Sequence, residues 1–379
     1  MEEMWDIIQK QQATIEQLKK QVEQTSVKIN SQAESSEQTH QALAILSDSI
    51  DEQTSSNQSK YKVGGYGELH YANTDKGNSI DFHRFVMFTG YDFTDNTRFY
   101  SELEVEHALS GGGGPGQVEV EQAFIEHRLN NRMKITAGIS LLPVGILNET
   151  HEPNTFYGVE RNTIEKNIIP TTWWAAGLGL SHQPSTTFGY DVFVGEGLNV
   201  PISGANAFII RKGRQKSAQA NASKGAVTAR IRLNPMTNLQ LNASMQYQQD
   251  ITQGALGVSA TLVEANATYT FNNFTLKALY ARWDLDDKVK LLASGREQQS
   301  GFYLEPSYRF GEHNQFGVFA RYSSWDNAAG VANFDTEIRQ SDVGFNFWLT
   351  PLVVFKINYQ DQAGAASDDG LFLGMGYSF

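Results

Sequence analysis

The sequence predicts an all-β barrel of about sixteen antiparallel strands that crosses a membrane, preceded by an α-helical coiled coil. Three observations lead to this prediction. From Lys60 onward, apolar residues recur at every second position, which is the period of a strand with one apolar face. The connections between these strands alternate between short and long. Residues 1–59 contain neither Gly nor Pro, and their apolar residues recur every seventh position, which is typical of a coiled coil.

The heptad pattern of residues 1–59 runs without a slip, and β-branched residues at its first seam position favour three helices. A lone amphipathic helix is the alternative. Residues 53–59, QTSSNQS, form a polar linker. The first seam position holds Ile8, Ile15, Val22, Ile29, Ser36, Leu43 and Ile50, and the second holds Met4, Gln11, Leu18, Thr25, Gln32, Thr39 and Leu46.

The barrel domain, residues 60–379, carries the alternating segments. Its connections are tight after even-numbered strands and mostly longer after odd-numbered ones, as in an outer-membrane barrel with a short-turn periplasmic rim. An even strand count places both ends of the barrel, and hence the coiled coil, in the periplasm; eighteen strands is the alternative count. The predicted strands span 61–72, 80–93, 97–108, 117–129, 132–140, 172–182, 187–195, 223–233, 237–250, 257–271, 274–284, 298–310, 315–325, 336–348, 351–361 and 369–379.

Composition and motifs narrow the function classes. The chain has 379 residues and no Cys, which excludes disulfides and thiolate chemistry. Its formal charge of −12 argues against a nucleic-acid partner. It contains no GxSxG motif and no P-loop, and GGGGPG at 111–116 is better explained as a flexible connection. We therefore predict that the protein is not an enzyme and needs no cofactor.

Alternation predicts which charged side chains face the lumen, because a charge on the lipid face costs about 2–4 kcal/mol at mid-membrane. Acidic residues gather on the third and fourth strands and basic residues on later ones, so opposite walls would set up a transverse field. The alternative is that these groups only pair with one another. The predicted lumen residues are Arg98, Glu102, Glu104, Glu106, Glu119, Glu121, Lys134, Arg230, Arg232, Lys277, Arg309, Arg321 and Lys356.

The long loop at about 141–171 is rich in apolar residues, so we expect it to fold into the barrel and narrow the pore. Its charged candidates at the constriction are Glu149, His151, Glu152 and Arg161. The segment ETHE at 149–152 offers one imidazole and nearby carboxylates, which are plausible metal ligands. A single His without a partner at ligand spacing is more often a hydrogen-bonding loop residue, so we predict no metal site.

The final nine residues, LFLGMGYSF, present an apolar face at every second position. A closed barrel has no free edge, so this strand is expected to pair with the first. Tyr377 and Phe379 would then lie at the periplasmic interface. A terminal Phe with an aromatic residue two positions earlier resembles the C-terminal signature that the barrel-assembly machinery reads in bacterial outer-membrane proteins.

Three segments carry a resemblance to a known family: DFHRFVMFTGYDF, SELEVEHALSGGGGPGQVEVEQAFIEHRL and NETHEPNTFYGVERNTIEKNIIPTTWW. With them the chain resembles the trimeric porins grouped with the phosphate-selective porins O and P, including siderophore-porin relatives that carry an N-terminal coiled coil. The resemblance implies a sixteen-stranded trimeric barrel. Phosphate-selective members use a run of inward arginines, whereas the arginines here are scattered and opposed by glutamates.

The expected function is passive diffusion of small polar or charged solutes through a homotrimeric porin in the outer membrane of a Gram-negative bacterium. The alternatives are a channel selective for an anionic nutrient such as phosphate or a dicarboxylate, or for an iron–siderophore complex. A structural tether is the alternative from another class of function: the coiled coil would reach about 75–80 Å and could link the membrane to peptidoglycan. Other expected partners are outer-membrane lipid, lipopolysaccharide and the barrel-assembly machinery.

Overall fold

The computed structural model describes residues 60–111, 113–331 and 336–379. The predicted coiled coil and linker, residues 1–59, lie outside the described residues. Among the described residues, no helix is both long enough and apolar enough to cross a membrane.

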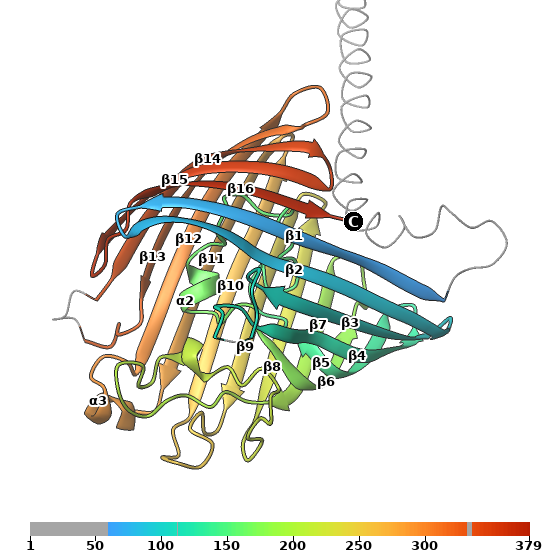
Figure 1. The fold of residues 1–379 in the computed structure, drawn as a ribbon. Coiled ribbons are helices and arrows are strands. Elements are labelled where there is room, and N and C mark those ends of the chain that lie inside the picture. Colours follow the sequence, from blue (N-terminus) through green and yellow to red (C-terminus); the bar gives the residue numbers. More distant parts are fainter. Residues whose placement is uncertain (1–59, 112, 332–335) are drawn as a thin grey trace, which may run out of the picture. The chain divides into compact units, whose positions relative to one another are not determined.

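Sixteen antiparallel strands close into one barrel within the described part of the chain (Figure 1). Each strand pairs with its neighbour in sequence, and β16 pairs with β1. The prediction of sixteen strands is confirmed. The strands are β1 (Tyr61–Thr74), β2 (Gly77–Thr94), β3 (Thr97–Glu106), β4 (Val118–Asn130), β5 (Met133–Leu141), β6 (Trp174–His182), β7 (Phe188–Glu196), β8 (Gly225–Met236), β9 (Leu239–Gln248), β10 (Ala260–Phe271), β11 (Phe274–Leu285), β12 (Gln298–Phe310), β13 (Phe316–Asp326), β14 (Ile338–Thr350), β15 (Val353–Gly364) and β16 (Gly370–Ser378).

The barrel is apolar outside, and its inner face is polar except where two long loops pack against it. On β8, Val227 and Ile231 are exposed on the outer face, whereas Thr228 between them is buried on the inner face. Phe310, Phe316, Phe347 and Phe355 flank the short β12–β13 and β14–β15 turns and form a chain of ring contacts on the outer surface. A band of aromatic rings at one rim is typical of a barrel at a membrane interface.

The last strand closes the barrel through the register that pairs Tyr66 with Ser378 and Thr74 with Gly370. Phe379 follows β16, and its backbone N–H and C=O both bond to Gly65 at 2.9 Å. Its ring stacks against Phe85 of β2, with 6.1 Å between centroids. The terminal residue is therefore bonded into the seam rather than left as a loose end.

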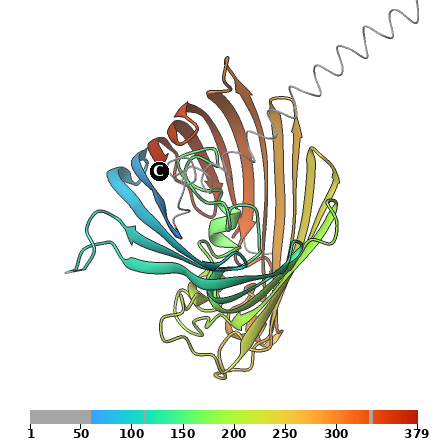
Figure 2. The ribbon, with the colours of Figure 1, turned by 90° about the vertical axis from the view of Figure 1, so that its right-hand side faces the viewer.

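The main apolar core lies inside the barrel, where two long loops cover the inner faces of β10 to β13. The β5–β6 loop, residues 142–173, contains the short helix α2 (Ile164–Asn167), and the β7–β8 loop, residues 197–224, contains the 3₁₀ turn η1 (Ile210–Gly213). A third short helix, α3 (Lys288–Leu292), lies between β11 and β12. Figure 2 shows the green β5–β6 segment surrounded by the strands.

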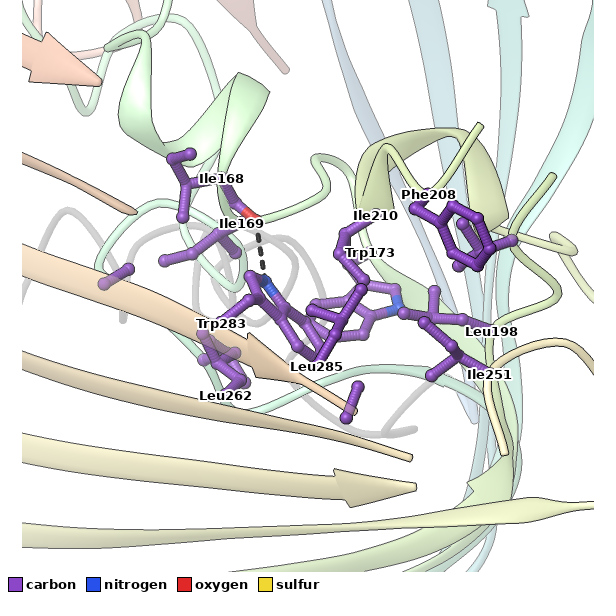
Figure 3. Close-up of a cluster of buried hydrophobic side chains, with 14 of the residues drawn as sticks. Ile168, Ile169, Trp173, Leu198, Phe208, Ile210, Ile251, Leu262, Trp283 and Leu285 are labelled. Carbon is purple, nitrogen blue, oxygen red and sulfur yellow. Dashed lines mark hydrogen bonds between the residues drawn. The ribbon is translucent and has the colours of Figure 1, made fainter. Parts of the chain in front are cut away.

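Trp283 of β11 joins the two loops to the wall (Figure 3). Its indole Nε1–H donates to the Ile168 carbonyl at 3.0 Å, and its ring contacts Trp173. Ile168, Ile210 and Trp283 are all fully buried. Moving either loop out of the barrel would expose these side chains, so burial of apolar area holds both loops inside.

Two β-bulges change the face pattern on the acidic side of the barrel. The β1–β2 register shifts at Glu68/Leu69, which leaves His83 as an extra residue on β2. The β3–β4 register shifts at Glu102/Leu103, which leaves Glu121 as an extra residue on β4. A bulge re-aims side chains, and both extra residues lie beside the charged lumen described next.

Candidate functional site

The β5–β6 loop is clamped by two buried polar side chains. Asn148 donates to the carbonyls of Leu142 and Trp173 and accepts from the Trp173 N–H, so it ties the two ends of the loop together. Glu165 accepts from the N–H groups of Ile146 and Leu147 at 2.7 and 2.6 Å.

The Glu165 carboxylate also explains a glycine at the turn of this loop. Gly145 has φ +79°, a conformation that L side chains rarely adopt, and an added Cβ would approach Glu165 Oε1 to 2.3 Å. Burial raises the pKa of Glu165, although donation from Asn162 and the two backbone N–H groups opposes this shift. The loop therefore has a defined shape built around one buried acid.

A cavity of about 140 Å³, which we call the loop cavity, lies where both long loops face the wall of β1 to β4. Six glutamates and six arginine or lysine side chains line it, and the two signs come from different elements. Five of the acids are on the strands, and five of the bases are on the loops. The acids on strands are Glu68, Glu104, Glu106, Glu119 and Glu121, and the bases on loops are Arg161, Lys166, Arg211, Arg214 and Lys216.

The basic side of the loop cavity is fixed by contacts of the β7–β8 loop. Arg214 donates to the carbonyls of Thr171 and Thr172 at 2.8 and 2.7 Å, and Lys216 pairs with Glu119. Burial, and then repulsion from Arg211, lower the pKa of Arg214. Charges of opposite sign on facing walls set up a field across the cavity.

A second cavity of about 430 Å³, which we call the wall cavity, lies along β3 to β8. Arg230 donates to Asp191 at 2.8 Å and also pairs with Glu149 of the β5–β6 loop, while Arg232 lies 3.0 Å from Asp191. On its other side, Glu126 pairs with Arg98 at 3.0 Å and with Lys134 at 2.8 Å. Ion pairs therefore account for most of the charged side chains that line the wall cavity.

A buried network separates the two cavities. Arg84 donates to Glu68 at 2.5 Å and to the His151 carbonyl at 2.8 Å, which fixes the loop to β2. His70 bridges Glu68 and Glu160 at 3.2 and 3.0 Å. Glu121 lines the loop cavity, and His151 lines the wall cavity. The network thus joins residues that line one cavity to residues that line the other.

The structure brings together many of the predicted lumen residues and separates others. One or other cavity is lined by Arg98, Glu102, Glu104, Glu106, Glu119, Glu121, Lys134, Glu149, His151, Glu152, Arg161, Arg230 and Arg232. Neither cavity is lined by Lys277, Arg309, Arg321 or Lys356.

The four residues outside the cavities have partners elsewhere in the barrel. Arg321 is buried between Glu305 and Asp342, at 3.1 and 3.2 Å. Arg309 lies over the Trp348 ring, and Lys356 lies over the Phe156 ring of the β5–β6 loop. Lys277 is half-buried and pairs in register with Glu305.

Sequence reasoning missed three groups of residues. Arg84 and Asp191 are single charges on strands and gave no local signal. Arg211, Arg214 and Lys216 lie in the run RKGRQK of the second long loop, and this basic cluster could have been found. Arg230 and Arg232 are among the predicted basic lumen residues, whereas the bases that line the same cavity as Glu104 to Glu121 come mostly from the loops.

Comparison with known proteins gives one relative in sequence and many in fold. No protein-family model matches the chain. A protein of Aquifex aeolicus (strain VF5), described only as an uncharacterized protein, is 31% identical over 326 residues, covering 78% of this chain and 74% of the relative.

Among solved structures, the anion-selective porin from Comamonas acidovorans aligns with a TM-score of 0.61 at 12% identity, over 84% of this chain and 99% of that one. Salmonella typhi OmpF in complex with daunomycin aligns with a TM-score of 0.60 at 13% identity, over 84% of this chain and 97% of that one. OmpT of Vibrio cholerae in a trimer form aligns with a TM-score of 0.57 at 11% identity, over 84% of this chain and 99% of that one. These likenesses establish a porin-type barrel fold.

Proposed function

This chain belongs to the same family as the Aquifex aeolicus protein, and we propose that it is an outer-membrane porin through which small polar or charged solutes diffuse. The observation that carries the proposal is the inverted polarity of the barrel: apolar side chains face outward, and charged groups line two cavities inside. An aqueous lumen is the environment in which such charges are stable. The Gram-negative outer membrane is the membrane that holds barrels of this kind.

The β5–β6 loop is the proposed constriction. It carries Arg161 into the lining of the loop cavity, and Glu149 and His151 into the lining of the wall cavity. In the loop cavity, acids on the strands face bases on the loops, so a solute with separated charges would be oriented as it passes. Lumen charges of both signs favour weak selectivity over strict selection of one anion.

Assembly as a homotrimer is part of the same proposal. The resemblance to trimeric porins and a fold neighbour described in a trimer form support it. The proposal also places residues 1–59 in the periplasm as a three-helix coil, because both barrel ends would lie on the short-turn rim. Contact of the barrel with lipopolysaccharide and the assembly machinery would follow from its place in the outer membrane, and contact with peptidoglycan would follow from a periplasmic coil.

Reversal potentials under a salt gradient test the proposed pore lining. Arg230→Gln with Arg232→Gln leaves Asp191 and Glu149 without their partners, so permeability is expected to shift toward cations. The matched change, Glu106→Gln with Glu119→Gln, removes two acids from the loop cavity and is expected to shift permeability toward anions. Unchanged reversal potentials in both folded variants would show that these residues do not line the solute path.

A selective channel is the second candidate, and the basic run of the β7–β8 loop is the observation that favours it. Arg211, Arg214 and Lys216 converge on one cavity, and cation clusters of this kind bind phosphate or carboxylate groups. Block of the conductance by micromolar phosphate, a dicarboxylate or an iron–siderophore complex would support this candidate. A folded barrel with no conductance would instead favour the tether.

A further inference from the structure

Two glutamates and one histidine from three distant segments meet inside the barrel. Glu102 lies on β3, Glu121 on β4 and His151 on the β5–β6 loop, and one oxygen or nitrogen of each lies within 4.8 Å of the other two. The exposed fractions of the three residues are 2%, 1% and 3%. The partners that His151 lacks in its own sequence neighbourhood are therefore supplied by the barrel wall.

We propose that Glu102, Glu121 and His151 form a binding site for a divalent transition-metal ion of the zinc class. His151 Nε2 lies 3.4 Å from Glu121 Oε2 and 3.7 Å from Glu102 Oε1. Metal bonds of about 2.1 Å at a tetrahedral centre hold ligand atoms about 3.4 Å apart. The two distances from His151 Nε2 thus match the spacing of ligands around one such ion, and the two carboxylate oxygens lie within 4.8 Å of each other.

The facing atoms are buried but not hydrogen-bonded. His151 Nε2 and Glu121 Oε2 both lack a hydrogen bond of normal geometry, although neither is exposed to solvent. Buried polar atoms in native proteins are nearly always satisfied, so two orphans that face each other call for a ligand between them. The two carboxylates carry the charge of −2 that a divalent cation would neutralise.

The groups behind the ligands are those that orient a metal site. His151 Nδ1 lies 3.1 Å from the Asn148 carbonyl, so this nitrogen donates to the carbonyl and Nε2 is the nitrogen that would bind the metal. Gln122 donates to Glu102 Oε2 at 2.5 Å, and the Tyr66 hydroxyl donates at 3.4 Å to Oε1, the oxygen that faces His151. The β-bulge on β4 places both Glu121 and Gln122 beside the site.

The Arg84 guanidinium is directed elsewhere. Arg84 donates to Glu68 and to the His151 carbonyl, and it lies 4.0 Å from Glu104. Arg84 therefore donates to none of the three ligand atoms. A metal at this point would join the loop to β3 and β4 between the two cavities, and it would make that junction less negative.

Zinc binding to the metal-stripped, full-length protein in detergent tests the proposal. Isothermal titration with Zn²⁺ is expected to show one tight site, which His151→Gln weakens at least 100-fold. His107→Gln is the matched control, because His107 belongs to a separate group with Asp81 and His83 and its loss should leave the tight site intact. Heat-modifiable migration shows that each variant is folded.

Cobalt provides a measurement on the unmutated protein. Co²⁺ bound in a tetrahedral site absorbs visible light strongly, and added Zn²⁺ should abolish this absorption as it displaces the cobalt. The proposal is overturned if the folded protein binds no Zn²⁺, if His151→Gln leaves the affinity unchanged, or if only His107→Gln removes binding. In the last case the metal belongs to the Asp81, His83 and His107 group.

Discussion

Replacing Glu165 with Ala is expected to release the β5–β6 loop from its packed position. The carboxylate is fully buried and accepts hydrogen bonds from Ile146 N–H, Leu147 N–H and Asn162 Nδ2, the last at 2.8 Å. Without it, three buried donors lose their acceptor, at about 1–3 kcal/mol each. The variant also no longer buries a carboxyl group, which offsets part of this loss. We therefore expect the free energy of opening the packed loop to fall by about 3 kcal/mol.

A loss of about 3 kcal/mol raises the population of opened loop by more than about 100-fold. Native-state proteolysis reports this population, because the loop contains trypsin sites at Arg161 and Lys166. Cleavage between β5 and β6 should accelerate in Glu165→Ala while the barrel stays heat-modifiable. Glu312→Ala, which removes an exposed acid from the β12–β13 turn, is the control. Cleavage at the same rate in the folded variant and the original protein would refute the proposed role of Glu165.

Three further predictions concern Glu165, the terminal Phe379 and residues 1–53. Burial raises the pKa of Glu165. The packed loop should therefore become less stable, and trypsin should cleave it faster, as pH rises above the ordinary carboxyl range and through the folded-state pKa. Glu165→Gln should flatten this pH dependence of the cleavage rate. Phe379→Glu should reduce the heat-modifiable barrel in the outer membrane, because it removes the ring stacked on Phe85 and the proposed assembly signal, whereas Phe379→Tyr should not. Deleting residues 1–53 should weaken trimers without altering β content, and trimers of undiminished heat resistance would contradict a role for the coil in assembly.

The strands could be predicted from the sequence because lipid imposes one apolar face on every strand. The alternation around Val227 and Ile231, or along the last nine residues, is the direct result of that constraint. The closed order of sixteen strands confirms the strand count that the alternation predicts. The same alternation fails at a bulge, where one extra residue breaks the period. His83 and Glu121 are such residues, and no local pattern marks them.

The contacts of the candidate site could not be predicted because they join segments far apart in the chain. His151 meets Glu102 and Glu121, and Arg230 meets Glu149, only after the loop has folded into the closed barrel. A single histidine in ETHE carries no local sign of either carboxylate. The basic residues near Lys216 were visible as a run, but their position opposite the acidic strands depends on how the second loop packs.

The conductance of the purified, folded protein in a planar lipid bilayer tests the central proposal most directly. A water-filled lumen narrowed by the β5–β6 loop predicts stepwise current increments that are proportional to voltage and grow with salt concentration. Protein shown to be folded by heat-modifiable migration that inserts but produces no current steps would contradict the proposal that this barrel is a porin.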